Sequence, residues 1–343
     1  MPHTWQRPVV VYGAGAIGGL IAGRLRLAGF DVTAVARGEH LRALRADGLT
    51  LQTQAGAETV ALPSAADAGE VDWSAEPVVI LAVKSHQTHA ALDDLAAHAP
   101  AATPVFVAQN GVANEAAVLR RFADVYAVAV LVSAAHLEPG VVVQQSYPVT
   151  GILDLGRYPA GRDDVAEQLS EAFRSAQFLS EVRDDIVAWK YRKLIANLGN
   201  GVTAAYRPGP DADELVAQAR AEAERVLSAA GIPVVSAERD AQRRGDLLRG
   251  RVREDYFGST WQSVARGHTD VETDWFNGEI VLQARLSGLV APVNELLQRS
   301  TAEHARRGRS PRTLDAAAAL AELAACASPV GLFSREVRCS SSA

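Results

Sequence analysis

Apolar runs and helical stretches alternate along the first half of the chain. The apolar runs are rich in β-branched and aromatic residues and lie at residues 8–12, 31–36, 76–84 and 103–111. Helically spaced apolar positions follow the first and third of these runs, at residues 17–28 and 85–99. Strands that are apolar on both faces and separated by helices predict a doubly wound parallel sheet, so we expect an α/β fold.

The pattern changes twice further along the chain. Between residues 125 and 155, β-rich runs follow one another with turn residues and no helical stretch, which predicts an antiparallel extension at the sheet edge. After about residue 185, helical patterns dominate, at residues 183–206, 211–231, 272–288 and 293–308.

These changes predict the domain organisation. We expect an α/β domain over residues 1–184 and an all-helical domain over residues 185–343. Within the second half, the short run at 232–235 is the one stretch with strand character, and residues 334–343 are typical of a loose tail.

Composition narrows the class of protein. The length of 343 residues suits about two domains, and 48% hydrophobic with 22% charged residues is typical of a soluble globular protein. A net charge of −6 argues against a general nucleic-acid or anionic-membrane binder. The two cysteines, Cys326 and Cys339, form no CxxC pair, which excludes a disulfide scaffold or a structural zinc module. With no leader-like segment and no apolar run of about 18 residues, we expect a cytoplasmic protein without a membrane partner.

A glycine-rich motif, GAGAIGG, begins at Gly13, between the first expected strand and the first expected helix. Gly13 would permit the tight turn, Gly15 would let a pyrophosphate approach the backbone, and Gly18 would allow close helix–strand packing. The helix would begin at Ala16 and Ile17, and its free N–H groups would face the phosphates. The motif alone also fits an ordinary glycine-rich turn, but its place between strand and helix predicts dinucleotide binding.

The second expected strand indicates which dinucleotide is bound. Enzymes that use NAD place Asp or Glu at the end of this strand, whereas here the strand ends at Arg37 and Asp31 stands at its start. A guanidinium suits the 2′-phosphate of NADP(H), which we therefore prefer over NAD(H), although a solvated loop arginine remains the alternative. Lys84 and Asn110 follow the third and fourth expected strands, where ligands of open α/β sheets bind. Each of these two, taken alone, also fits a capping or loop residue.

Polar residues in the helical half recur with helical spacing. Lys190, Lys193, Asn197 and Asn200 are separated by three, four and three residues, which predicts two amines and two carboxamides on one helix face. Such faces are usually solvated, but asparagine is uncommon in a solvent-facing helix interior. A second polar cluster contains Ser259, Thr260 and, further on, Glu272. We expect no metal site there, because histidines or cysteines at ligand spacing are missing.

Taken in order, these motifs resemble the ketopantoate reductase (2-dehydropantoate 2-reductase) family over nearly the whole chain. The motifs are GAGAIGG, VKSHQT, QNGV, RKLIANLGNGVTA, STWQS and VETDWFNGE. The resemblance implies an N-terminal Rossmann-type domain that binds NADPH and a C-terminal helical domain similar to that of 6-phosphogluconate dehydrogenase. It also implies reduction of a small 2-oxo acid, with 2-dehydropantoate reduced to pantoate in pantothenate and coenzyme A biosynthesis as the leading example.

The resemblance also implies roles for single residues. Lys193 matches the family's catalytic lysine, which donates a proton to the 2-oxo oxygen as hydride reaches C2. Glu272 matches the glutamate that holds this lysine and a substrate hydroxyl in place. Asn110 matches the asparagine between nicotinamide and substrate, and Asn197 the first substrate asparagine on the lysine helix. Thr260, with Ser259 beside it, falls where the family has a substrate-binding serine, and Lys84 and Arg37 match cofactor positions.

One departure from the family pattern concerns the substrate. The family's second asparagine stands four residues after the first, where this chain has Gly201, and Asn200 lies one position earlier. Two other functions therefore stay open: a related reductase for another oxo acid, and an NADPH-binding regulator without turnover. The superfamily also includes proteins that dimerise through their helical domains, so a homodimer is compatible with the resemblance.

Overall fold

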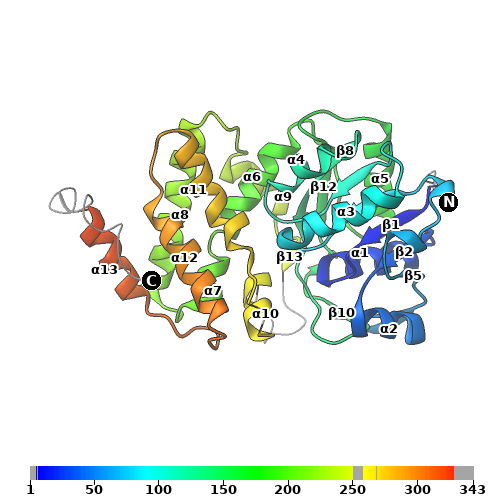
Figure 1. Ribbon diagram of the computed structural model, residues 1–343, viewed down its shortest axis with the longest axis horizontal. Coiled ribbons are helices and arrows are strands. Elements are labelled where there is room, and N and C mark those ends of the chain that lie inside the picture. Colours follow the sequence, from blue (N-terminus) through cyan, green and yellow to red (C-terminus); the bar gives the residue numbers. More distant parts are fainter. Residues whose placement is uncertain (1–4, 6, 250–257, 268, 328–343) are drawn as a thin grey trace. The chain divides into compact units, whose positions relative to one another are not determined.

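The computed structural model describes residues 5, 7–249, 258–267 and 269–327 (Figure 1). The chain forms two compact units, of which the first contains Met1–Ala196 and Ile232–Gln262 and the second contains Asn197–Gly231 and Ser263–Ala343. The chain thus returns to the first unit after residue 231. The domain boundary expected at residue 184 stays a prediction, and the tail expected at 334–343 lies outside the described residues.

A seven-stranded sheet forms the centre of the first unit, in the order β12-β8-β7-β6-β1-β2-β5. In chain order the strands are β1 (Val9–Tyr12), β2 (Val32–Val35), β5 (Ser64–Ala65), β6 (Val78–Leu81), β7 (Val105–Val107), β8 (Val125–Leu131) and β12 (Ile152–Arg157). All neighbours pair in parallel except β12, which runs antiparallel to β8 at the edge. The six parallel strands have the order of a dinucleotide-binding fold, so the predicted fold class is confirmed.

Helices cover both faces of this sheet, which explains why its strands are apolar throughout. On β1, Val9 and Val11 pack into the core under α1 (Ala16–Leu27) and α5 (Asp164–Ser175). The alternate residues Val10 and Tyr12 face the core under α3 (Thr88–His98) and α4 (Asn114–Leu119). Successive side chains of a strand point to opposite faces, so a strand between two helical layers has no polar face. Short 3-10 turns lie at η1 (Ala68–Glu70), η2 (Trp73–Ala75) and η3 (Ser85–Gln87).

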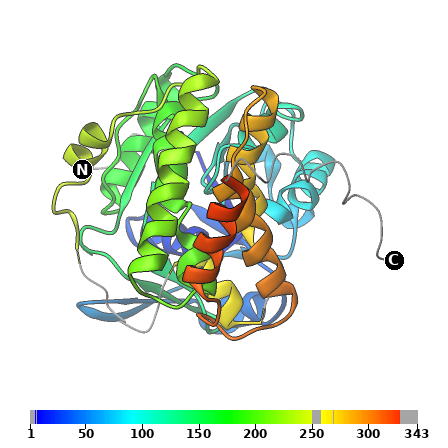
Figure 2. The ribbon, with the colours of Figure 1, turned by 90° about the vertical axis from the view of Figure 1, so that its left-hand side faces the viewer.

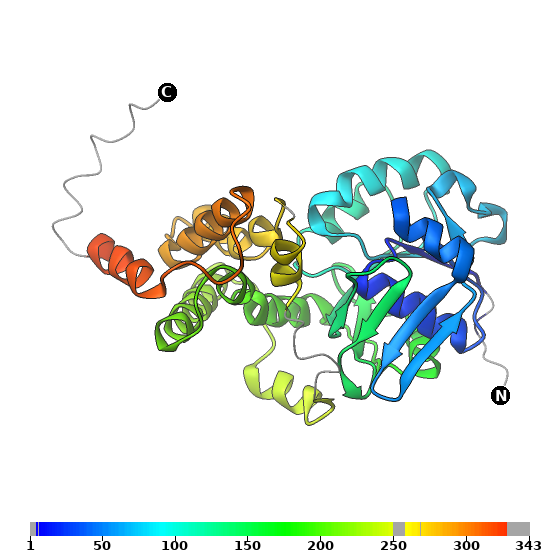
Figure 3. The ribbon, with the colours of Figure 1, turned by 90° about the horizontal axis from the view of Figure 1, so that it is seen from below.

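A second sheet packs on α1 in the first unit. Its order is β4 (Gly56–Val60), β3 (Leu49–Thr53), β10 (Val141–Gln144) and β9 (Ala134–Ala135) (Figure 3). β3 and β4 directly follow α2 (Gly38–Asp47) in the chain, whereas β9 and β10 come much later. Two glycines of α1 allow its close approach: a Cβ on Gly19 would lie 2.9 Å from Val142, and one on Gly23 would lie 2.9 Å from Leu49. The antiparallel extension of the main sheet is therefore confirmed for β12 and wrong for β10, which pairs in parallel with β3 instead.

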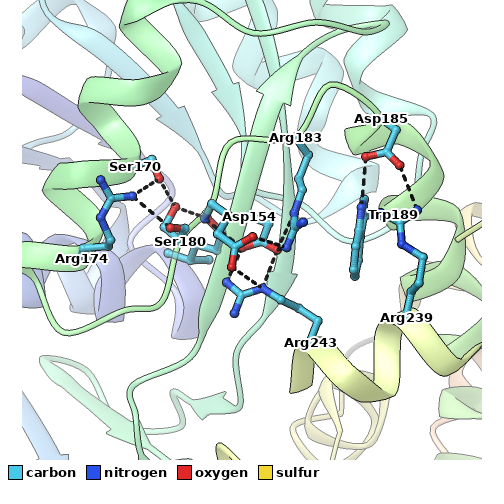
Figure 4. A network of polar contacts seen from close by, with 11 residues as sticks. Asp154, Ser170, Arg174, Ser180, Arg183, Asp185, Trp189, Arg239 and Arg243 are labelled. Carbon is cyan, nitrogen blue, oxygen red and sulfur yellow. Dashed lines mark hydrogen bonds and ion pairs between the residues drawn. The ribbon is translucent and has the colours of Figure 1, made fainter. Parts of the chain in front are cut away.

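Residues 232–249 pack against the rest of the first unit, and several of these contacts are polar. Arg243 of α9 (Ala237–Arg244) forms two hydrogen bonds to the buried carboxylate of Asp154, of 2.7 and 2.9 Å, and Arg183 contacts the same carboxylate at 3.0 Å (Figure 4). The Trp189 ring of α6 (Ile186–Asn197) contacts Arg183 at 4.5 Å and Arg239 at 5.4 Å. These contacts hold α9 beside α6.

The strand expected at 232–235 is wrong. Residues 232–236 have no regular structure, because the backbone of Val235 bonds to α6: its N–H donates to Ala188 and its carbonyl accepts from Arg192. The short strand of this segment is β13 (Leu248–Arg249), which pairs with β11 (Tyr147–Pro148). α10 (Ser259–Ala265) follows it in the chain.

The second unit is built from helices, as the sequence predicts (Figure 2). They are α7 (Asn200–Ala205), α8 (Pro210–Ala229), the turn η4 (Glu272–Trp275), α11 (Asn277–Leu286), α12 (Pro292–Arg306) and α13 (Ala316–Ala327). The buried Glu222 of α8 accepts the backbone N–H groups of Val293 and Asn294 at the start of α12. The Asn277 side chain of α11 donates to Asn294 at 2.9 Å, so polar contacts link α8, α11 and α12. Among the described helices, none has the length and hydropathy needed to span a bilayer.

Candidate active site

The glycine-rich loop joins β1 to α1 at the carboxyl edge of the main sheet. Gly13 has φ +102°, and a Cβ there would lie 2.7 Å from the Val83 side chain, so this turn requires glycine. A Cβ on Gly18 would lie 2.0 Å from the Gly13 carbonyl oxygen. At Gly15, by contrast, a Cβ would meet none of the described atoms within 4 Å. The loop is therefore tightly packed behind and open at Gly15, as a cradle for a pyrophosphate requires.

The N-terminus of α1 offers unneutralised N–H groups beside this open space. No side chain of the described chain caps the helix at Gly15, and its first turn, which starts with Ala16 and Ile17, contains no acidic residue. Such a helix end carries partial positive charge and four N–H groups without helical partners. The loop and helix end fit the phosphates of a dinucleotide, although the predicted contacts themselves remain a proposal.

A histidine that the sequence analysis did not identify supports this loop. One ring nitrogen of His40, Nε2, lies 2.8 Å from the Ala14 carbonyl, and the other, Nδ1, accepts from the Gly140 N–H at 2.9 Å. Because Nδ1 accepts, the proton of the neutral ring lies on Nε2 and is donated to the loop. Burial, together with His136 at 4.3 Å between ring centroids, lowers the pKa of His40 to about 4. No sequence pattern indicates this residue, because its partners lie 26 and 100 positions away.

The end of β2 presents a cation and no carboxylate. Arg37 is exposed and directly precedes α2, and one of its terminal nitrogens lies 3.4 Å from the Tyr12 hydroxyl. Asp31 stands before β2, at the opposite end of the strand. A guanidinium at this edge can bind a phosphate through paired hydrogen bonds.

Lys84 and Asn110 lie at the carboxyl ends of adjacent parallel strands. Lys84 follows β6 and directly precedes η3, whereas Asn110 follows β7, and both side chains are partly buried. The strands β1, β6 and β7 are neighbours, so their carboxyl ends and the glycine-rich loop share one edge of the sheet. The structure therefore brings Arg37, Lys84 and Asn110 to the sheet edge that the sequence predicts.

The two lysines of α6 have different surroundings. Lys190 is buried in an ion pair with Glu115, and its Nζ also donates to the Gln109 carbonyl at 2.9 Å. Lys193 is partly buried, and its pKa falls from 10.5 to about 8, chiefly through burial and further through the Arg244 charge, while Asp240 raises it. An amine that titrates near neutral pH can give and take a proton during turnover.

One prediction about these polar residues is wrong: the four do not share a helix face. α6 ends at Asn197, a turn follows at Leu198 and Gly199, and α7 begins at Asn200. At this break Gly199 packs against α8, where a Cβ on Gly199 would lie 3.0 Å from Val216. The Asn277 side chain donates a hydrogen bond to the Leu198 carbonyl in the same turn.

The position of the family's second asparagine has no room for one. A Cβ on Gly201 would lie 2.7 Å from the Thr301 hydroxyl of α12. Asn197 is buried and Asn200 is partly buried, and both lie in the second unit. A side chain at position 201 would therefore require Thr301 to shift.

The remaining predicted residues fall in both units. Thr260 is buried on α10 in the first unit, and Ser259 starts the same helix, but its side chain lies outside the described residues. Glu272 opens η4 in the second unit and is 6% exposed. The pairing of Lys193 with Glu272 thus stays a prediction. Over the described part of the chain, no group of three His, Cys, Asp or Glu side chains could hold a metal ion.

Known protein families and proteins match this chain over most of its length. Two family models match: "Ketopantoate reductase PanE/ApbA" over residues 9–159 and "Ketopantoate reductase PanE/ApbA C terminal" over residues 185–304. The chain is 32% identical to a 2-dehydropantoate 2-reductase of Pyrococcus horikoshii, over 84% of this chain and 94% of the relative. It is 29% identical to a 2-dehydropantoate 2-reductase of Halobacterium salinarum, over 83% and 94% of the two chains.

Solved structures agree with this result. The crystal structure of a PanE/ApbA family ketopantoate reductase from Ralstonia eutropha matches 88% of this chain and 99% of its own, with 26% identity and a TM-score of 0.73. D-mandelate dehydrogenase, solved with NADH and anilino(oxo)acetate, has a TM-score of 0.74 at 19% identity, covers 88% of this chain and 99% of its own, and shows the shared fold.

The sheet order and the glycine-rich turn define the dinucleotide-binding class of α/β proteins. Within this class, the chain belongs to the ketopantoate reductase family. The members of this family are NAD(P)-dependent reductases that convert a carbonyl to a CH–OH group. The resemblance predicted from the sequence is thereby confirmed.

Proposed function

We propose that this protein reduces 2-dehydropantoate to pantoate with NADPH. The observation that carries the proposal is the Lys193 amine, whose pKa of about 8 suits proton donation, in the same unit as the dinucleotide-type sheet edge. The relatives over most of the chain are named 2-dehydropantoate 2-reductase, which supports this substrate. Bound NADPH would supply the hydride that reaches C2 of the keto acid.

The residues of the chain would bind, orient and protonate. Lys193 would hydrogen-bond the 2-oxo oxygen and donate a proton as negative charge develops on it, and Glu272 would hold the lysine and a substrate hydroxyl. Asn110 would separate nicotinamide from substrate. The other substrate contacts of the proposal are Asn197, Asn200 and either Ser259 or Thr260.

NADPH is preferred over NADH because of the cation at the end of β2. Arg37 would bind the 2′-phosphate, Lys84 would bind the nucleotide, and the loop of Gly13, Gly15 and Gly18 would receive the pyrophosphate. Arg37 is exposed, so its terminal nitrogens can turn toward a phosphate.

One observation favours a second candidate, the reduction of a different 2-oxo acid by the same machinery. The family's second substrate asparagine is replaced here by Gly201, and Thr301 occupies the space its side chain would need. A substrate that needs no contact from that asparagine would lose nothing at this site.

A panel of 2-oxo acids that includes 2-dehydropantoate, assayed by NADPH oxidation, decides between these functions. We expect the highest kcat/KM with 2-dehydropantoate. Turnover of other members of the panel only would favour the second candidate. Tight NADPH binding without turnover of any member would instead indicate a regulator. We further propose a cytoplasmic homodimer. Light scattering during size-exclusion chromatography would measure its mass.

A further inference from the structure

A buried ion pair lies one helical turn before Lys193. The Lys190 ammonium of α6 pairs with the Glu115 carboxylate of α4, and the two side chains are only 4% and 1% exposed. The same ammonium donates to the Gln109 backbone carbonyl at 2.9 Å, and Gln109 directly precedes Asn110. A single amine therefore links the lysine helix to the loop that carries the predicted nicotinamide-facing asparagine.

Buried hydrogen bonds extend this link to the loop of Lys84. The Gln109 side chain donates to the Val83 carbonyl at 2.8 Å and to the Thr88 hydroxyl at 2.9 Å. Thr88 donates to Asn114, and Asn114 donates to Ser85, both at 3.1 Å. Lys84 thus stands between two residues of the network, and Asn110 directly follows a third.

Stability alone does not explain the pair. Removing two charges from water costs about as much as their attraction returns, so an apolar pair of similar size would stabilise the fold at least equally. In addition, Glu115 Oε2 and Gln109 Oε1 are buried without a hydrogen-bond partner among the described residues, which costs further free energy. What a charged pair provides and an apolar pair does not is direction, because the ammonium holds two acceptors in one geometry.

We propose that Lys190 is a positioning residue of the reductase site. Its ammonium, neutralised by Glu115 and bonded to the Gln109 carbonyl, fixes α6, and hence Lys193, against the loops that carry Lys84 and Asn110. The inference rests on the proposed function, in which proton donor and hydride donor act on one carbonyl. Displacing catalytic groups by about 1 Å lowers rates by about 10²-fold, so a rigid link between them has a large effect.

Two double variants separate positioning from stability. Lys190→Met with Glu115→Met removes both charges at nearly constant volume, so we expect Tm near the wild type. We expect kcat to fall by about 10²-fold, the KM for NADPH to change little, and the kinetic isotope effect with deuterated NADPH to increase because hydride transfer becomes limiting. Lys190→Arg with Glu115→Asp keeps both charges and their combined length, and we expect it to recover most of kcat. Arg121→Gln with Asp93→Asn, an exposed ion pair at 2.7 Å, is the control that leaves both readouts unchanged.

Hydrogen exchange tests the positioning without any turnover. In the Met/Met variant we expect faster amide exchange in residues 83–88 and 109–115 than in the wild type. Wild-type kcat together with unchanged exchange in that variant would overturn the inference. Absence of wild-type turnover with every 2-oxo acid would instead refute the proposed function, while the exchange rates would still decide whether Lys190 orders the two loops. If the Met/Met variant fails to fold, Lys190→Gln with Glu115→Gln, which removes both charges and the ammonium bond to Gln109, is measured in the same way, and wild-type exchange and kcat again overturn the inference.

Discussion

The two charged groups of α9 near Lys193 should move the pH dependence of reduction in opposite directions. Burial and Arg244 lower the pKa of Lys193 from 10.5 to about 8, and Asp240 raises it. At about 1.4 kcal/mol per pKa unit, this disfavours the ammonium by roughly 3 kcal/mol. Because reduction needs the ammonium, we expect kcat/KM to fall about tenfold per pH unit above pH ~8. Oxidation of the hydroxy acid needs the neutral amine and should rise through the same pH.

The variants are Arg244→Gln and Asp240→Asn. Loss of Arg244 removes a like charge and frees Asp240, whose carboxylate accepts the Arg244 Nε at 2.7 Å, so the pKa of Lys193 should rise by about one unit. Loss of Asp240 leaves Arg244 unopposed, so that pKa should fall. The assay is kcat/KM for reduction between pH 6 and 10 at saturating NADPH, with Arg285→Gln, from an exposed ion pair, as the control. If both variants move the profile the same way, or neither moves it, Lys193 is not the titrating proton donor.

Three further predictions concern the proposed cofactor site and the residues that support it. Arg37→Asp should weaken NADPH relative to NADH by about 10- to 100-fold, the value of a charged hydrogen bond, and an unchanged ratio of the two Kd values would refute the role of Arg37. Gly18→Ala should lower the free energy of unfolding by about 1–3 kcal/mol through overpacking. Gly15→Ala should leave Tm unchanged and weaken NADPH binding. Calorimetry measures unfolding and NADPH binding, and equal effects of the two variants on Tm would contradict the packing around these glycines. The pKa of His40 is depressed to about 4, so the unfolded state binds more protons between pH 4 and 6.5, and stability should fall as pH falls through this window. Denaturant titrations across that range should show a smaller decline for His40→Gln, and an equal decline would exclude His40 as the cause.

Much of the sheet edge was predictable from local patterns. Buried strands between helices are apolar on both faces, so β1, β2, β6 and β7 were recognisable, and with them the carboxyl ends at which Arg37, Lys84 and Asn110 lie. The second sheet was not predictable. Its strand β10 pairs with β3, about 90 residues earlier in the chain, and two glycines of α1 make the contact possible.

The sequence by itself determined the fold class, the glycine-rich turn and the residue types at the strand ends, because these depend on side-chain periodicity and backbone freedom over a few neighbours. The family resemblance singled out Lys193, but the helical spacing alone could not show that Lys190, an identical side chain one turn away, has a different task. The tertiary structure decided this, since the partner of Lys190 is Glu115, 75 positions away. It also returned residues 232–262 to the first unit and so placed Arg244 and Asp240 where their charges act on Lys193. Electrostatics in a folded chain depends on distance in space and on burial, and neither can be read from the order of the residues.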